Sequence, residues 1–312
     1  MSGWTLLRGA AAGTVARLTY AALTSRQPGG EKLWTRTNHR GEPVTLLEGP
    51  AVSVAAAASA LATPGLAANE RAALAIAGFG AGAVGAYDDL AGGGDRRGFR
   101  GHLGALADGE VTTGAVKIIG VGVAGMAAAV LLDQGRSGVG TIRRLADIAI
   151  NAGLVAGAAN LTNLFDLRPG RAIKVSLLAG TALAVAGPKA RAGVAAPVGA
   201  GVALLGEDLG ERAMLGDCGA NALGAMLGVA AAAALPRPVR LAALAGIVGL
   251  TAASEKVSFT KVIARTPVLN WLDMLGRRPV PAPPADHAEP PPPDQHRGEP
   301  RGVVPPEYSR AT

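Results

Sequence analysis

Residues 72–89 read AALAIAGFGAGAVGAYDD, an apolar run without charge that ends in two adjacent carboxylates, Asp88 and Asp89. A glycine-rich stretch, residues 92–101, follows the pair. An ionisable residue at the edge of a membrane helix is costly to place, so such residues point by default to a functional site. Charged residues also commonly mark the end of a membrane span without any further role. The pair alone does not decide between these interpretations, and two motifs further along the chain favour the first.

The composition is typical of a polytopic membrane protein. Of the 312 residues, 49% are apolar and only 17% are charged, whereas about a quarter of the residues in a soluble domain are charged. The 45 glycines and the many alanines fit closely packed helices, because small side chains let two backbones approach. We therefore expect an all-α, integral membrane bundle of about nine to ten transmembrane helices.

The apolar stretches predict nine spans, several of them short for a bilayer crossing, so this count carries an error of one or two. The first span contains Arg8 and Arg17, which either snorkel, line the bundle interior or make this helix interfacial. The N-terminus has no pattern of a removable signal peptide. The predicted spans cover residues 4–23, 44–62, 72–87, 111–132, 145–164, 172–186, 190–205, 218–235 and 239–253.

The basic residues predict the orientation of the bundle. If the loop after the first span is cytoplasmic, roughly two thirds of the 30 Lys and Arg residues lie on the cytoplasmic side, as the positive-inside rule requires. This places the N-terminus outside and the C-terminus inside. We expect the membrane to be the plasma membrane. The net charge of +7 is scattered over loops and tail, which favours contacts with anionic lipid or substrate phosphates and argues against nucleic acid.

The chain divides into a bundle, residues 1–255, and two C-terminal segments. Residues 256–278 alternate apolar and polar side chains and predict an amphipathic element on the cytoplasmic face. Residues 279–312 are rich in proline, hold almost no large apolar residue and predict a disordered cytoplasmic tail. The single cysteine, Cys218, excludes an internal disulfide and a cysteine-based metal cluster.

Three acidic motifs fall at predicted cytoplasmic ends of spans, so that a bundle can bring them together. Besides the adjacent carboxylates, these are residues 160–166 (NLTNLFD) and residues 214–221 (MLGDCGAN). Asn160, Asn163 and Asp166 are spaced three apart and share one face of a helix. Asparagines in membrane helices can also serve only to join neighbouring helices.

Carboxylates that meet at a membrane edge suit a hard cation, because Mg²⁺ binds through one or two carboxylates plus substrate phosphates. A diphosphate bridged by a metal and attacked by a phosphate oxygen needs mainly positioning and charge neutralisation. His39 and His102 are interpreted as solvated loop residues. The basic residues placed to hold a diphosphate are Arg96, Arg97, Arg100, Lys117, Arg168, Arg171 and Lys174.

These motifs resemble those of the polyprenyl-phosphate N-acetylhexosamine-1-phosphate transferases. That family includes the phospho-N-acetylmuramoyl-pentapeptide transferases and the undecaprenyl-phosphate N-acetylglucosamine-1-phosphate transferases. The resemblance covers about residues 30–230, in the order of the family. The residues that carry it are Asp88-Asp89, Asn160-x-x-Asn163-x-x-Asp166 and Leu215-Gly216-Asp217-Cys218-Gly219-Ala220-Asn221-x-Leu223-Gly224, with weaker support from Thr113-Gly114 and Lys117.

The resemblance implies a reaction that depends on Mg²⁺, with Mn²⁺ as a substitute. An oxygen of a polyprenyl phosphate attacks the sugar-proximal phosphate of a UDP-sugar and releases UMP. By the same resemblance, Asp88, Asp89 and Asp217 are the catalytic and metal-binding residues: Asp217 ligates the metal, Asp88 deprotonates or orients the lipid phosphate, and Asp89 supports the metal or Lys117. The implied substrate-binding residues are Asn160, Asn163, Asp166, Lys117 and Asn221, with Asn163 and Asp166 at the nucleotide end. The expected partners are the lipid carrier, the UDP-sugar and the membrane, and a homodimer is compatible with the sequence.

Differences from the family pattern keep a second hypothesis open. Leu167 stands where the family has a glycine, Gly92 stands where the peptidoglycan enzymes have a lysine, and the sequence lacks the His-rich loop that comes late in the family. A catalytically inactive relative that binds the lipid carrier or nucleotide, or acts as a scaffold, would tolerate such losses. Retention of the acidic positions favours the enzyme. A transporter ranks last, because its polar residues would gather at mid-membrane; only Asp147, near the outer end of the fifth span, has no explanation.

Overall fold

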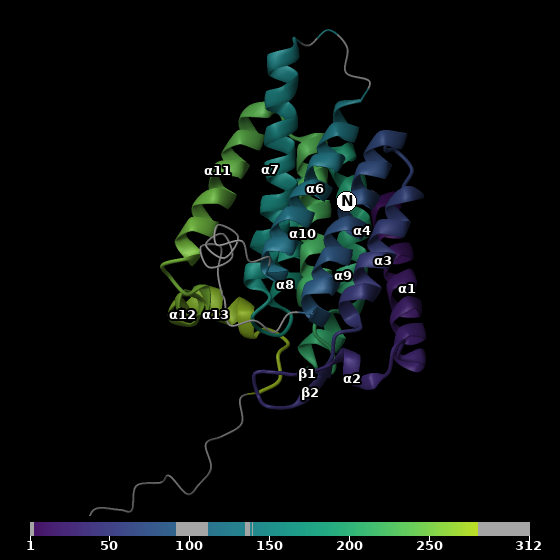
Figure 1. The fold of residues 1–312 in the computed structure, drawn as a ribbon, viewed down its shortest axis with the longest axis vertical. Coiled ribbons are helices and arrows are strands. Elements are labelled where there is room, and N and C mark those ends of the chain that lie inside the picture. Colours follow the sequence, from purple (N-terminus) through teal and green to yellow (C-terminus); the bar gives the residue numbers. More distant parts are fainter. Residues whose placement is uncertain (1–2, 92–111, 135–137, 139, 280–312) are drawn as a thin grey trace, which may run out of the picture. The chain divides into compact units, whose positions relative to one another are not determined.

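The computed structural model describes residues 3–91, 112–134, 138 and 140–279, and these residues are mostly helical (Figure 1). The described residues up to Arg278 belong to one compact unit. Arg96, Arg97, Arg100, His102 and the Pro-rich segment from residue 280 lie outside the described residues. The elements are α1 (Gly3–Arg26), α2 (Glu31–Trp34), β1 (Thr35–Thr37), β2 (Pro43–Thr45), α3 (Glu48–Leu61), α4 (Ala68–Ala91), α6 (Thr113–Asp133), α7 (Thr141–Phe165), α8 (Arg171–Ala184), α9 (Pro188–Leu209), α10 (Gly216–Ala234), α11 (Arg237–Ser254), α12 (Phe259–Arg265) and α13 (Pro267–Met274).

Helix α10 lies at the centre of the bundle. Nearly all of its residues are buried, and α3, α4, α7 and α9 pack around it (Figure 1). Glycines allow this packing: side chains at Gly224 and Gly228 would collide with the backbone of α7 at Ala158 and Leu154. The expectation that small residues let the helices approach closely is thus confirmed for the central helix.

Four of the described helices, α6, α7, α9 and α10, are long and apolar enough to cross a membrane. Helices α11 and α12 meet the same criteria together, although the chain bends by 95° between them, which gives up to five spans. Each predicted span coincides largely with a helix, but the expected count of nine to ten is not confirmed. Helices α3 and α8 have only 14 residues, or about 21 Å at 1.5 Å per residue, which is short of the roughly 30 Å hydrocarbon core.

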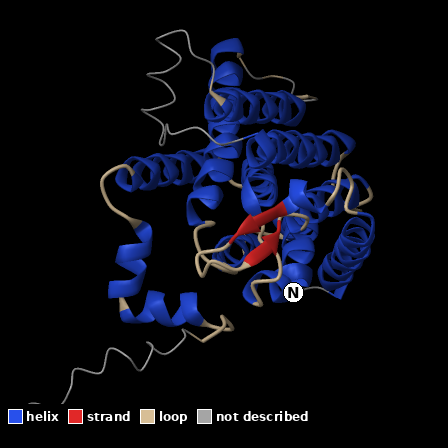
Figure 2. Ribbon diagram, turned by 60° about the horizontal axis from the view of Figure 1, so that its bottom comes forward, coloured by secondary structure: helices blue, strands red, loops and turns tan. Residues whose placement is uncertain are grey.

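The first loop contains a β-hairpin, which the all-α expectation did not include. β1 and β2 pair antiparallel (Figure 2). Asn38 closes the turn, because its Oδ1 accepts hydrogen bonds from the backbone N–H groups of Arg40 (2.8 Å) and Glu42 (2.9 Å). Gly41 in the turn has a φ of +82°, a conformation that glycine adopts without strain.

The hairpin also corrects the start of the second predicted span, residues 44–62. Val44 and Thr45 belong to β2, and α3 begins only at Glu48. Val44, Leu46 and Leu47 are as apolar as the helix that follows, so hydropathy alone does not separate the strand from α3. Backbone pairing with β1 decides the boundary.

Asp147 obtains partners that its position in the sequence did not indicate. It lies buried in α7 and pairs with Arg240 (3.3 Å) and Arg237 (3.4 Å) at the start of α11. Arg240 also donates to Asn151, one turn further along α7. Because Arg240 is the only buried residue of α11, this polar cluster is a main attachment of α11 to the bundle.

Candidate active site

Three residues from three helices meet at one end of the bundle. Lys117 in α6 donates from Nζ to Asp88 Oδ2 in α4 (2.6 Å) and to Asp217 Oδ2 in α10. The side chains of Asp88, Lys117 and Asp217 are 15%, 23% and 23% exposed, so the cluster is partly accessible to solvent. The structure therefore brings together two of the acidic motifs identified in the sequence, those of Asp88 and Asp217, and Lys117 links them.

Local structure places each of these side chains. Thr112 precedes α6 and its Oγ1 accepts from the N–H of Ala115 (3.1 Å), which starts the helix so that Lys117 comes in its second turn. Gly85 lies one turn before the carboxylates of α4, and a side chain there would collide with the carbonyl group of Asp217. The glycines of the apolar run thus allow α4 to lie directly against the start of α10.

Asp89 has a different position from its neighbour. Its Oδ1 accepts from the backbone N–H of Asp217 (3.0 Å), and its Oδ2 accepts from the N–H of Cys218 (2.9 Å). These N–H groups belong to the first turn of α10, and N–H groups in a first turn have no acceptor within their own helix. Arg36 of β1 donates to the carbonyl oxygen of Asp89 (2.6 Å). Asp89 therefore caps α10 and holds Asp217 in place, and each of its two carboxylate oxygens accepts one of these bonds.

The remaining predicted site residues lie nearby without joining the Lys117 cluster. Asn221 is buried in α10, one turn beyond Asp217. Asn160 and Asn163 are partly buried in the last two turns of α7. Among the described residues, no hydrogen bond links any of these asparagines to Asp88 or Lys117.

Asp166 follows directly on α7 and lines a cavity of about 230 Å³ together with residues of the hairpin and of the loop between α9 and α10. Most of these partners were not identified as functional from the sequence, because they come from separate loops. The cavity is lined by Thr37, Asn38, His39, Val44, Asp166, Leu167, Arg168, Pro169, Asp208, Glu211, Ala213 and Met214.

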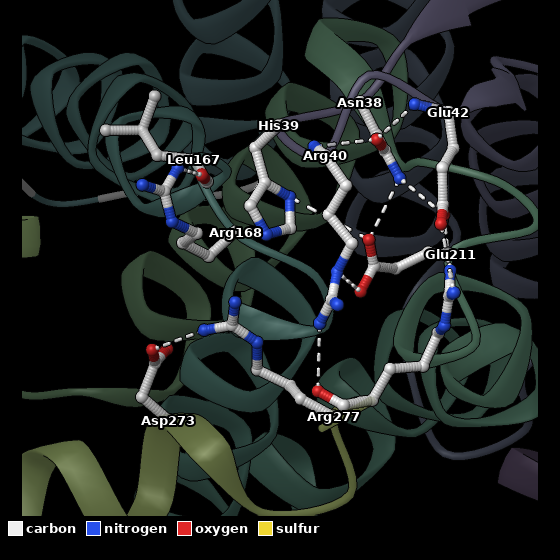
Figure 3. Close-up of polar contacts among 10 residues, drawn as sticks. Asn38, His39, Arg40, Glu42, Leu167, Arg168, Glu211, Asp273 and Arg277 are labelled. Carbon is white, nitrogen blue, oxygen red and sulfur yellow. Dashed lines mark hydrogen bonds and ion pairs between the residues drawn. The ribbon is translucent and has the colours of Figure 1, made fainter. Parts of the chain in front are cut away.

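Glu211 organises the polar side of this cavity (Figure 3). It accepts from Asn38 Nδ2 (2.9 Å) and pairs with Arg40 (2.9 Å), so it ties the β-hairpin to the loop before α10. His39 Nδ1 lies 3.8 Å from Glu211 Oε2. Burial lowers the pKa of His39 below its ordinary value although Glu211 opposes this shift, so the imidazole is mostly neutral at pH 7. His39 therefore lines the cavity wall from the hairpin turn, and it remains exposed, as expected of a loop residue.

Two of the basic residues expected to hold a diphosphate are used elsewhere. Arg171 donates to both carboxylate oxygens of Asp273 (2.7 and 3.0 Å), and Lys174 donates to the backbone carbonyl groups of Leu272 and Asp273. These contacts attach α13 to the start of α8. Of the expected basic set, Arg168 lines the cavity and Lys117 contacts Asp88.

The residues that the structure describes include no group of three or more His, Cys, Asp and Glu side chains arranged to hold a metal ion. Asp88 and Asp217 offer two carboxylates on either side of Lys117. No protein-family model matches this chain, and no curated protein matches it.

Proposed function

We propose that this chain transfers a phospho-sugar from a UDP-sugar to a polyprenyl phosphate at the cytoplasmic face of the plasma membrane, releasing UMP and serving cell-envelope glycan synthesis. The observation that carries the proposal is the meeting of Asp88, Lys117 and Asp217 at one partly exposed point. The resemblance of the same motifs to the polyprenyl-phosphate transferases supports it independently of the geometry.

The two substrates of such a reaction are both anionic, so the site has to position them and offset their charge. An oxygen of the lipid phosphate forms a bond to the sugar-linked phosphorus, the bond from that phosphorus to the bridging oxygen breaks, and UMP leaves with the electron pair. Lys117 supplies a cationic group on a flexible stem beside the reacting phosphates. Asp88 takes the proton of the lipid phosphate or orients it.

Asp88 and Asp217 fit Mg²⁺, because this ion is bound in proteins by one or two carboxylates together with substrate phosphates and water. Bound by these residues, Mg²⁺ or Mn²⁺ would neutralise charge on the diphosphate. Both carboxylate oxygens of Asp89 accept backbone N–H groups of α10, so we assign the metal to Asp88 and Asp217 first. The role of Asp89 in the proposal is to position Asp217.

The cavity beside Asp166 is the proposed site of the nucleotide end. Its volume of about 230 Å³ lies below the roughly 300 to 1,000 Å³ of pockets that enclose a whole ligand. It therefore suits one part of the nucleotide, with the diphosphate extending toward Lys117. Arg168 and the neutral His39 line this cavity.

A catalytically inactive relative is the alternative. In that case the same side chains would bind the lipid carrier or the nucleotide without turnover. The two proposals differ in one observable, which is the release of UMP.

The test is UMP release by purified protein supplied with undecaprenyl phosphate, Mg²⁺ and a panel of UDP-sugars. We expect UMP that depends on the lipid and is lost when EDTA removes the metal. Asp88→Asn and Asp217→Asn are nearly isosteric and are expected to lower turnover at least about 100-fold, the lower end of the range for general acid–base groups. Glu31→Gln is the matched control, because Glu31 is an exposed carboxylate of α2 outside the site, and it should retain full activity.

Activity that persists in Asp88→Asn or Asp217→Asn would refute the role given to that residue. No UMP from any donor, with folded protein and an active transferase as a positive control, would refute the enzyme and favour the inactive relative. Binding of a UDP-sugar, measured by calorimetry on the same sample, would then test the alternative directly.

A further inference from the structure

Helices α12 and α13 form a short arm at the end of α11. The chain bends by 95° between α11 and α12, and both short helices lie beside the lower end of α11, away from the centre of the bundle (Figures 1 and 2). If α11 runs along the membrane normal, α12 lies close to the plane of the membrane. We call α12, α13 and the residues from Lys256 that lead into them the arm.

One side of the arm is attached to the bundle by specific contacts. Arg171 at the start of α8 binds Asp273 through two hydrogen bonds and also donates to Thr260 Oγ1 (3.0 Å). Phe259 stacks on Phe165 at the end of α7, with ring centroids 5.1 Å apart. This attached side orients the arm, because it fixes one face of each of the two helices.

The opposite side of α13 is apolar and exposed. At 100° per residue, Val268, Trp271 and Leu275 lie within about 40° of the direction opposite to Asp273. They are 68%, 62% and 54% exposed, respectively. Exposed apolar groups in such a row commonly mark a contact surface.

The opposite side of α12 is basic. Lys261 and Arg265 are four residues apart and project on the side away from Phe259. Both are exposed, as is Lys256 just before the helix. Asp273 is the only acidic residue between positions 256 and 278, and it faces the attached side. We define the outer face of the arm as Lys256, Lys261, Arg265, Val268, Trp271 and Leu275.

We propose that the outer face of the arm binds the surface of a membrane leaflet that contains anionic lipids. The three basic side chains contact lipid phosphates, and Trp271 with its two apolar neighbours enters the boundary between headgroups and acyl chains. This combination of cations with an amphipathic aromatic residue on one face is what binds helices to anionic bilayer surfaces. The bend of 95° between α11 and α12 supplies the geometry.

This contact would bear on the candidate active site without depending on its activity. The attached side of the arm contacts Phe165 of α7 and Arg171 of α8, which lie on either side of the loop that contains Asp166. A leaflet that holds the arm therefore also steadies one wall of the cavity beside Asp166. The proposal goes beyond the transferase function and can be tested on protein that has no turnover.

The experiment follows the fluorescence of Trp271 in nanodiscs. Trp4→Phe and Trp34→Phe leave Trp271 as the single tryptophan, since the chain has three. Discs are made from neutral phosphatidylcholine or from a mixture with phosphatidylglycerol, with bromine on the upper acyl chain as the quencher. We expect at least about twofold stronger quenching in the anionic discs, falling toward the neutral value at 1 M salt, where the screening length is only about 3 Å.

Charge variants separate the outer face from general attraction to the membrane. In the triple variant Lys256→Gln, Lys261→Gln and Arg265→Gln, the difference between the two kinds of disc should disappear. The matched control is Arg26→Gln with Lys32→Gln, which removes exposed cations of α1 and α2 outside the arm and should leave the difference unchanged.

A second measurement uses the chain with all its tryptophans. Cleavage by trypsin at the three basic positions of the arm should be slower in anionic than in neutral discs. Equal quenching and equal cleavage in both discs would overturn the proposal. Protection of Trp271 that instead rises with protein concentration, together with crosslinks between copies, would also overturn it and assign the face to a second copy of the chain.

Discussion

Replacing Asp89 with alanine removes the acceptor of two N–H groups in the first turn of α10. In the native structure these groups, from Asp217 and Cys218, each donate to one carboxylate oxygen of Asp89 at 3.0 and 2.9 Å. Alanine leaves both donors without a protein partner. The side chain that depends most on this turn is Asp217, since its own backbone N–H is one of the two.

The cost follows from the number of bonds lost. A buried donor left without an acceptor costs about 1–3 kcal/mol, and substitution of a capping residue by alanine costs about 0.5–2 kcal/mol. Two donors are involved, but water can reach this partly exposed end of the helix and replace some of the loss. We therefore expect Asp89→Ala to lower the free energy of unfolding by about 2–4 kcal/mol. At roughly 2–4 °C per kcal/mol for large domains, this lowers the Tm by about 4–16 °C.

The assay is thermal unfolding in detergent, with Asp88→Ala as the matched control. Both variants remove one carboxylate from the same end of α4. Asp88, however, pairs with the partly exposed ammonium group of Lys117, and such pairs contribute about 1 kcal/mol or less. Asp88→Ala should therefore unfold near the wild-type temperature and yet lose activity. A Tm for Asp89→Ala within 2 °C of that of Asp88→Ala, on the scale of the same size rule, would refute the capping role.

Three further outcomes are expected. Gly85→Ala should destabilise the protein by about 1–3 kcal/mol, because its new methyl group would collide with the carbonyl group of Asp217. The control is Gly122→Ala, whose methyl group meets nothing within 4 Å and should leave the Tm unchanged or slightly raised. Equal Tm values for the two variants would contradict the close approach of α4 and α10. Burial alone would raise the pKa of Asp273, but the hydrogen bond and charge of Arg171 outweigh it and hold the pKa below its usual value of 3.8. The stability from this pair is thus fully present above about pH 4 and lost as the pH falls further, so wild-type Tm should drop more steeply in acid than that of Asp273→Asn; parallel pH profiles would count against the pair. Removal of divalent metal by EDTA should abolish UMP release and readdition of Mg²⁺ or Mn²⁺ should restore it, whereas turnover in EDTA would exclude the proposed metal dependence.

The sequence predicted most of the helices and the centre of the candidate site. Apolar runs of suitable length correspond to helices because hydropathy and length are properties of each segment alone. The acidic motifs at the ends of these runs were expected to converge, and Asp88, Lys117 and Asp217 do meet. These three residues come close together because each lies near a helix end, and these ends lie on the same side of the bundle.

The different roles of adjacent residues could not be predicted in this way. Asp88 and Asp89 are chemically identical and successive, yet one faces Lys117 and the other caps α10. Successive residues of a helix point about 100° apart, so only the position of α10 beside α4 decides which carboxylate reaches which partner. The partners of Asp147 could not be predicted either, because its arginine partners lie about 90 positions further along the chain.

What the sequence determined by itself is most of the helices, their membrane-like composition and the identity of the charged residues at their ends. The tertiary structure alone decided that residues 43–45 pair as a strand, that Glu211 and His39 build a cavity with Asp166, and that Arg171 holds the arm. The physical reason is that segment hydropathy is a local quantity. A hydrogen bond or ion pair depends on the relative placement of two backbones that the sequence specifies only through the complete fold.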